Sequence, residues 1–138
     1  MKEKLFIGID PDVDKSGFAL WLPEFKELML NQYSLFDLFN ELLGYHKNYD
    51  LTVVLEAGHK VKKTWHKGGN GMAKRVGANN EIGRQIEKFL TDNKISFELV
   101  MPKGYSSYTH KDFCKITGYK GQTNSEKRVS GLLVYGRK

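Results

Sequence analysis

Two apolar stretches of the sequence each end in a carboxylic acid. Residues 4–9 are apolar at nearly every position and lead to Asp10, and residues 51–55 lead to Glu56. Both stretches predict buried β-strands, and a carboxylate at the end of such a strand is costly to bury alone. It needs a cation, and a metal ion held in a cleft is a common one. Asp10 and Glu56 are therefore the first candidates for chemistry.

The segment between these two strands bears on whether the acids meet. Residues 35–47 carry leucine and phenylalanine at helical spacing and predict an amphipathic helix. A helix between two strands favours a parallel pair, and α/β proteins bind ligands at the edge where the carboxyl ends of parallel strands lie. We therefore expect Asp10 and Glu56 to converge. The alternative is that Glu56 is a solvated acid at a strand end.

The segment that begins at Asp10 has three interpretations. Asp10, Asp12 and Asp14 alternate as in a calcium-binding loop. Such a loop needs Gly at its sixth position and Glu at its twelfth, and Lys15 and Trp21 stand there instead, so we exclude it. A plain turn with solvated acids suits Asp12 and Asp14. The third interpretation is a hairpin whose first strand ends in a metal-binding acid.

A basic segment follows Glu56. The chain has no acidic residue between Ala57 and Asn80, and a tryptophan stands among its lysines and histidines. Stacking surfaces interleaved with phosphate-seeking charges are typical of nucleic-acid sites. The alternative is a solvated loop with its tryptophan folded onto the domain. The candidates for nucleic-acid contacts are Lys60, Lys62, Lys63, Trp65, His66, Lys67, Lys74 and Arg75.

The remaining pattern predicts an α/β fold. Gly77 and Gly83 lower the helix propensity of one long predicted helix, so we expect close packing against the sheet there. The expected strands cover residues 4–10, 17–22, 25–31, 51–56 and 95–101, and the expected helices cover 35–47, 72–93, 110–117 and 124–135.

Composition narrows the class of protein. The 138 residues suffice for one compact domain, residues 1–138, and 40% of them are hydrophobic, as in globular rather than disordered chains. No apolar run approaches the length of a membrane span, and a strand rather than a signal peptide is expected at the start. The single cysteine, Cys114, suits a reducing cytoplasm. The net charge of +6 favours a polyanionic partner.

The opening hairpin resembles that of the RuvC-type Holliday-junction resolvases of the ribonuclease-H-like superfamily. The shared pattern is Ile-Gly-Ile-Asp-Pro at residues 7–11, then four residues and Ser16-Gly17. The resemblance implies that Asp10 is the first metal-binding acid, and it departs at Asp12, where the family usually has Gly. Actin-like sugar kinases open in a similar way but need two such domains, for which this chain is too short. The implied fold is ribonuclease-H-like, a mixed five-stranded sheet in the element order βββαβαβα with helices on both faces.

The last third of the chain resembles the same family in its lysines and glycines. A short helix with Lys115, a Thr-Gly-x-x-Gly turn at residues 117–121 and a Lys-bearing final helix follow the family order. The family places two acids three residues apart on that helix. Here Glu126 matches the first of them, and Val129 stands where the second is expected.

The resemblance implies a divalent-metal-dependent endonuclease that hydrolyses phosphodiester bonds in structured DNA, such as four-way junctions or related branches, as a homodimer. Asp10, Glu56 and Glu126 would bind two Mg²⁺ ions, with Mn²⁺ as a substitute, and Lys115 and Lys127 would contact phosphates. Two other hypotheses stay open. Val129 favours a nucleic-acid-binding protein that has lost catalysis, and a module that binds protein is the third.

Overall fold

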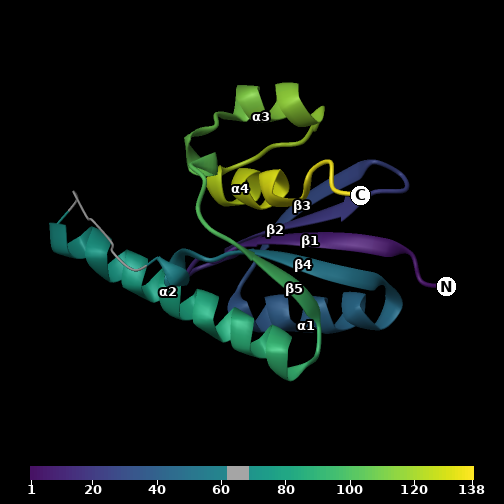
Figure 1. Cartoon of the computed structure of the whole chain (residues 1–138). Coiled ribbons are helices and arrows are strands. Elements are labelled where there is room, and N and C mark those ends of the chain that lie inside the picture. Colours follow the sequence, from purple (N-terminus) through teal and green to yellow (C-terminus); the bar gives the residue numbers. More distant parts are fainter. Residues whose placement is uncertain (62–68) are drawn as a thin grey trace.

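The computed structural model describes residues 1–61 and 69–138, which form a five-stranded sheet flanked by helices (Figure 1). The expected strands and helices are all present. Their bounds are β1 (Lys4–Asp10), β2 (Ser16–Leu22), β3 (Glu27–Tyr33), α1 (Leu35–Asn48), β4 (Asp50–Glu56), α2 (Gly69–Asp92), β5 (Ser96–Val100), α3 (His110–Thr117) and α4 (Ser125–Val134), with short 3₁₀ turns η1 (Gly58–Lys60) and η2 (Tyr105–Ser107).

The sheet has the strand order β3-β2-β1-β4-β5. Strands β1, β2 and β3 form an antiparallel meander, whereas β4 pairs parallel to both β1 and β5. Helix α1 makes the crossover from the meander to β4, as a parallel connection requires. Because Ile9 pairs with Leu55, the acids that follow them in the chain lie at the same edge of the sheet.

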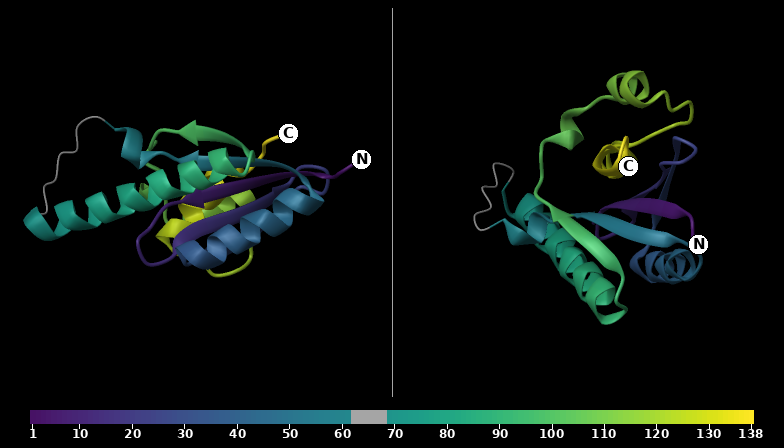
Figure 2. Two further views of the ribbon diagram at one scale, coloured as in Figure 1. Left: turned by 90° about the horizontal axis from the view of Figure 1, so that it is seen from below. Right: turned by 45° about the vertical axis from the view of Figure 1, so that its right-hand side comes forward.

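Helices cover both faces of the sheet (Figures 1 and 2). α1 and α2 lie on one face, and the N-terminal half of α2 extends past the sheet edge. α4 lies on the other face, and α3 packs on the far side of α4. The core under α1 and α2 includes Ile7, Ile9, Phe18, Val53, Leu55, Leu38, Leu42, Ile86 and Leu90, and the core under α4 includes Phe6, Ala19, Trp21, Val54, Val100, Leu133 and Val134.

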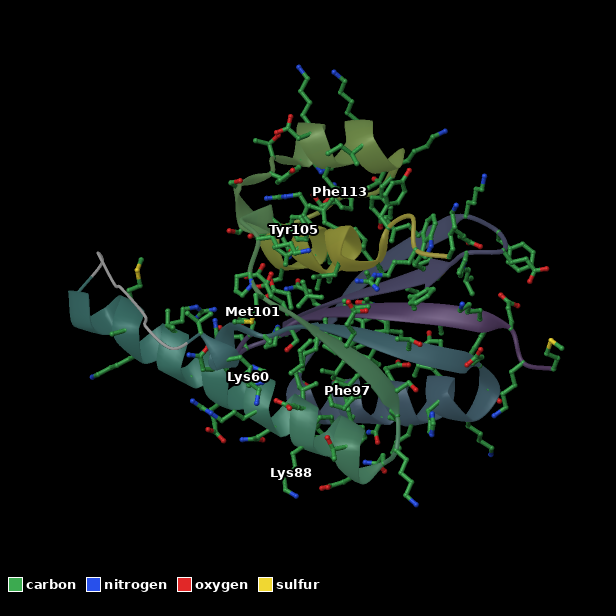
Figure 3. The ribbon with its side chains drawn as sticks, in the orientation of Figure 1. Lys60, Lys88, Phe97, Met101, Tyr105 and Phe113 are labelled. Carbon is green, nitrogen blue, oxygen red and sulfur yellow. The ribbon has the colours of Figure 1, made fainter. Side chains whose placement is uncertain are left out.

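Glycines let α4 approach the sheet backbone closely. A Cβ atom at Gly17 would overlap the carbonyl oxygen of Glu126, and one at Gly8 would overlap that of Ser130. One turn further out, Phe113 is fully buried between α3 and α4, where its ring packs against Gly131 (Figure 3). The first turn of α4 is therefore held directly over the start of β2.

Three local expectations differ from the structure. β3 begins at Glu27 rather than near Phe25, because Lys26 turns the chain with a φ of 51°. α2 begins at Gly69, earlier than expected from its glycine-rich start. The expectation of close packing against the sheet at Gly77 is wrong, since nothing lies within 4 Å of a Cβ placed there. Gly83 does pack closely, but against the ring of His59 rather than against the sheet. In the described part of the chain, no helix combines the length and apolar character needed to span a membrane.

Candidate active site

Asp10 and Glu56 converge on one pocket. The pocket has a volume of about 180 Å³ and lies between the carboxyl ends of β1 and β4 and one side of α2. The expected convergence of the two acids is therefore confirmed, and the alternative of an isolated, solvated Glu56 is not. The residues that line the pocket are Asp10, Pro11, Glu56, Gly58, His59, Val76, Asn79, Asn80 and Gly83.

The carboxyl group of Asp10 is poorly solvated and surrounded by negative charge. Burial, followed by the charges of Glu56, Glu126 and Asp12, raises the pKa of Asp10 to about 8. Burial also raises the pKa of Glu56. A bound cation would remove both penalties, because an opposite charge favours the ionised carboxylate. The electrostatics of this edge thus fit a positively charged ligand.

Glu126 approaches the site from the other face of the sheet. It lies in the first turn of α4, which Asn124 caps by accepting a hydrogen bond from the backbone N–H of Lys127 at 3.0 Å. The backbone and Cβ of Glu126 lie over Gly17, and Gly17 pairs with Asp10 across the β1–β2 ladder. Val129, one turn later, is only 2% exposed and packs in the core. α4 therefore brings one acid toward Asp10.

The donor set suits a hard divalent ion. Carboxylate oxygens are the ligands that Mg²⁺ and Mn²⁺ prefer, and Asp10 and Glu56 supply them from adjacent strands. Within residues 1–61 and 69–138, no three Asp, Glu, His or Cys side chains stand close enough together to enclose one ion. Asp10 and Glu56 fit the ion as a pair, and Glu126 contributes negative potential from a greater distance.

The turn after Asp10 is tied to α2. Asp12 is 8% exposed, so its interpretation as a solvated acid is wrong. Its carboxylate accepts hydrogen bonds from the backbone N–H groups of Asp14 and Lys15, and it pairs with Arg75 at 3.0 Å. Arg75 also pairs with Asp14 at 3.3 Å, so both turn acids engage this guanidinium.

A second side chain of α2 completes this attachment. The side-chain oxygen of Asn79 accepts a hydrogen bond of 2.7 Å from the backbone N–H of Val13. Arg75 and Asn79 are one turn apart on α2, so they hold the turn between β1 and β2 at two adjacent points. Arg75, predicted to contact nucleic acid, thus has an internal role.

The turn after Glu56 is also tied to α2. The His59 side chain is 2% exposed, and its Nε2 lies 2.8 Å from the Glu87 carboxylate, which Lys60 also approaches at 3.3 Å. The His59 hydrogen bond and the Lys60 charge lower the pKa of Glu87. The other ring nitrogen, Nδ1, is buried against Gly83 and has no hydrogen-bond partner in the described structure. Gly83 is needed because a Cβ there would lie 2.7 Å from Nδ1.

Comparison with solved structures identifies the fold. The chain is similar to T. thermophilus RuvC in complex with Holliday junction substrate, with a TM-score of 0.57 and 12% sequence identity over 94% of this chain and 89% of that chain. The chain has the ribonuclease-H-like fold. The large terminase nuclease from the thermophilic phage G20c with bound magnesium is also similar, with a TM-score of 0.44 and 17% identity over 75% of this chain and 47% of that chain. No protein-family model and no curated protein sequence matches the chain.

The remaining predicted site residues that the structure describes lie on different elements of the fold. Lys60 lies beside α2 (Figure 3) and Lys74 is exposed on the projecting half of α2. Lys127 is half-buried on α4, next to Glu126. Lys115 is exposed on α3, beyond α4, and is not among the residues that line the acid pocket. The predictions for Lys62, Lys63, Trp65, His66 and Lys67 fall outside the described residues.

Sequence reasoning missed the α2 wall of the pocket. Asn79 and Asn80 were not predicted as site residues, although two consecutive asparagines inside a helix are unfavourable for helix formation. Such a costly pair is a usable signal. His59 and Asp12 could not be assigned in the same way, because their partners Glu87 and Arg75 lie 28 and 63 residues away in the sequence.

Proposed function

We propose that this protein is a divalent-metal-dependent endonuclease that hydrolyses phosphodiester bonds in structured DNA, with four-way or related branched junctions as substrates. The observation that carries the proposal is the meeting of Asp10 and Glu56, from adjacent parallel strands, at one pocket of a ribonuclease-H-like fold. A partly buried pair of carboxylates at that edge is unfavourable without a cation.

Each acid has a distinct role in this proposal. Asp10, the more central and more strongly perturbed acid, and Glu56 would hold the Mg²⁺ ions, and Glu126 would support them with its negative charge from α4. When bound, the ions would activate water and stabilise the charge on the leaving oxygen. The contacts of α2 with the turns after Asp10 and Glu56 fix the backbone that follows each of these two acids.

The partner in this proposal is DNA with a branch. The net charge of +6 favours a polyanion, and Lys74, which is exposed on the projecting half of α2, offers a charge to a backbone phosphate. The similar RuvC structure contains a Holliday junction, which supports a four-way junction as the first substrate to test. A homodimer as the active form is proposed from the family resemblance of the sequence alone. Lys115 and Lys127 remain proposed phosphate contacts.

The test is cleavage of a labelled four-way junction in Mg²⁺, compared with duplex and single-stranded DNA of the same sequence. We expect junction-selective cleavage that EDTA and the Asp10→Asn substitution abolish, while Asp10→Asn still binds the junction. Binding without cleavage by the wild-type protein, in Mg²⁺ and in Mn²⁺, would reject the enzyme.

A second candidate function is nucleic-acid binding without catalysis. Val129 favours it, because a buried valine occupies the position at which a final metal ligand is expected from the family resemblance. In this case wild type and Asp10→Asn would bind the junction equally and neither would cleave it.

A further inference from the structure

The polar side chains around the acid pocket are nearly all engaged inside the protein. Asp10 and Glu56 are the proposed metal ligands, and the oxygen of Asn79 is used by the N–H of Val13. His59 faces Glu87 with one ring nitrogen and Gly83 with the other, so neither nitrogen is presented to a ligand. The other lining residues, apart from Asn80, are Pro11, Gly58, Val76 and Gly83, which offer no polar side chain.

Asn80 is the exception. It lines the pocket from α2, its side-chain oxygen lies 3.3 Å from the point that a Cβ on Gly58 would occupy, and it makes no side-chain hydrogen bond within residues 1–61 and 69–138. Its carboxamide thus lies beside the turn that begins two residues after Glu56. Asparagine is also a poor helix former compared with alanine, so this residue costs stability without an internal bond that repays it.

The chemistry of the pocket defines the ligand for this side chain. One wall carries the acids Asp10 and Glu56, so an anion can enter only together with cations, and the opposite wall carries neutral amides. A carboxamide NH₂ can donate to a phosphate oxygen without changing the charge balance.

We infer that Asn80 is a substrate-binding residue that donates a hydrogen bond to a non-bridging oxygen of the phosphodiester held at the acid pocket. The inference rests on the proposed function and extends it, because it assigns the wall opposite the metal ligands to the DNA backbone. Asn79, its neighbour in sequence, has a structural role instead.

The experiment compares Asn80→Ala and Asn80→Asp with wild type, using the four-way junction. Binding is measured in Ca²⁺, which supports complex formation without turnover, and kcat/KM is measured in Mg²⁺. Asn40→Ala on α1 is the matched control, since Asn40 is an exposed helical asparagine outside the pocket. Thermal melting, with and without Mg²⁺, reports folding and metal binding.

We expect Asn80→Ala to weaken junction binding and kcat/KM by about 10- to 100-fold, the range for a lost hydrogen bond to a charged group. Asn80→Asp should lose more, because its carboxylate repels the phosphate. The melting temperature of Asn80→Ala should equal or exceed that of wild type, and its Mg²⁺-induced shift should be unchanged. Asn40→Ala should bind and cleave like wild type.

Wild-type binding by Asn80→Ala would overturn the inference while leaving the nuclease proposal intact. A lower melting temperature with a reduced Mg²⁺ shift would overturn it too, because Asn80 would then act through the fold or the metal. If wild type binds no DNA, the proposed function itself fails, and the inference fails with it.

Discussion

The carboxylates of the candidate site come from two regions that differ in how the fold holds them. Asp10 and Glu56 end β1 and β4, which lie side by side with a further strand on each outer side, and the turns after them are fixed to α2 by Arg75 and His59. Glu126 lies in the first turn of a helix that touches the sheet through glycines.

This difference indicates which part of the site is more firmly positioned by the fold. The strand half of the site, which comprises Asp10 and Glu56, is positioned by the pairing of β1 with β4 and by separate polar contacts of each following turn with α2. The helix half of the site, which comprises Glu126, depends on how closely α4 can approach β1 and β2. The second turn of α4 carries the buried Val129 rather than an acid. We therefore expect the strand acids to dominate function and the helix to modulate it.

The largest expected effect is the loss of activity when a strand acid is neutralised. Asp10→Asn and Glu56→Gln should each reduce the proposed Mg²⁺-dependent cleavage by roughly 1000-fold, since each removes a proposed ligand of the ions that would stabilise the transition state. Glu126→Gln should reduce it by only about 10- to 100-fold, as for a group that supports the metal from a greater distance. Single-turnover cleavage of the junction measures all three. Equal losses from all three would show that the two halves act as one unit.

The pH dependence of stability should differ between wild type and Asp10→Asn. The pKa of Asp10 rises from 3.8 to about 8 on folding, so the folded protein holds this proton more tightly than the unfolded chain. The stability that this group contributes is complete below about pH 4 and is lost as the pH rises through 8, by an amount on the order of 6 kcal/mol. In thermal melts with EDTA, the melting temperature of Asp10→Asn relative to wild type should increase as the pH is raised from 4 to 8. Parallel curves from pH 4 to pH 9 would contradict this.

The helix half can be tested through its glycine contact. Gly17→Ala should lower the free energy of unfolding by about 3 kcal/mol, because the added methyl group overlaps the Glu126 carbonyl and pushes α4 away. Gly44→Ala in α1 is the matched control, since nothing lies within 4 Å of a Cβ there. It should raise the free energy of unfolding by about 0.5–1 kcal/mol. Urea unfolding measures both. A neutral Gly17→Ala would mean that α4 does not depend on this approach.

Breaking the contact between α2 and the turn after Asp10 should have a smaller effect. Substitutions at the adjacent residues Arg75 and Lys74 should distinguish this structural role from a contact with DNA. Arg75→Ala leaves the buried Asp12 without its cation, so it should lower the melting temperature by several degrees and reduce cleavage through the turn after Asp10. Lys74→Ala removes an exposed charge, so it should leave the melting temperature unchanged and reduce the salt dependence of DNA binding by about one ion. The reverse assignment of the two effects would show that Arg75, not Lys74, contacts DNA.

Much of the fold was predictable because the chain carries strong local signals. The apolar strands ending in Asp10 and Glu56, with one helix between them, were enough to predict a shared sheet edge. The start of β3 was not, because Lys26 adopts a left-handed conformation that glycine or asparagine would have signalled. The start of α2 was missed since glycine-rich sequence disfavours helix by local propensity.

The site was predictable where function needs particular residue types, and not where it needs distant partners. Carboxylates at strand ends stand out in a sequence, and the placement of Asp10 and Glu56 followed from them. The burial of Asp12 and the contact between His59 and Gly83 depend on α2, which follows much later in the chain. Such contacts appear once the sheet and helices are assembled.

The most direct test of the account is the anomalous diffraction of crystals soaked in Mn²⁺. The account predicts a strong peak between the carboxylates of Asp10 and Glu56, with oxygen ligands near the distance of about 2.1 Å typical of small octahedral divalent ions, and no such peak in Asp10→Asn. Ordered Mn²⁺ at other sites, with none between these two carboxylates at saturating concentration, would contradict it.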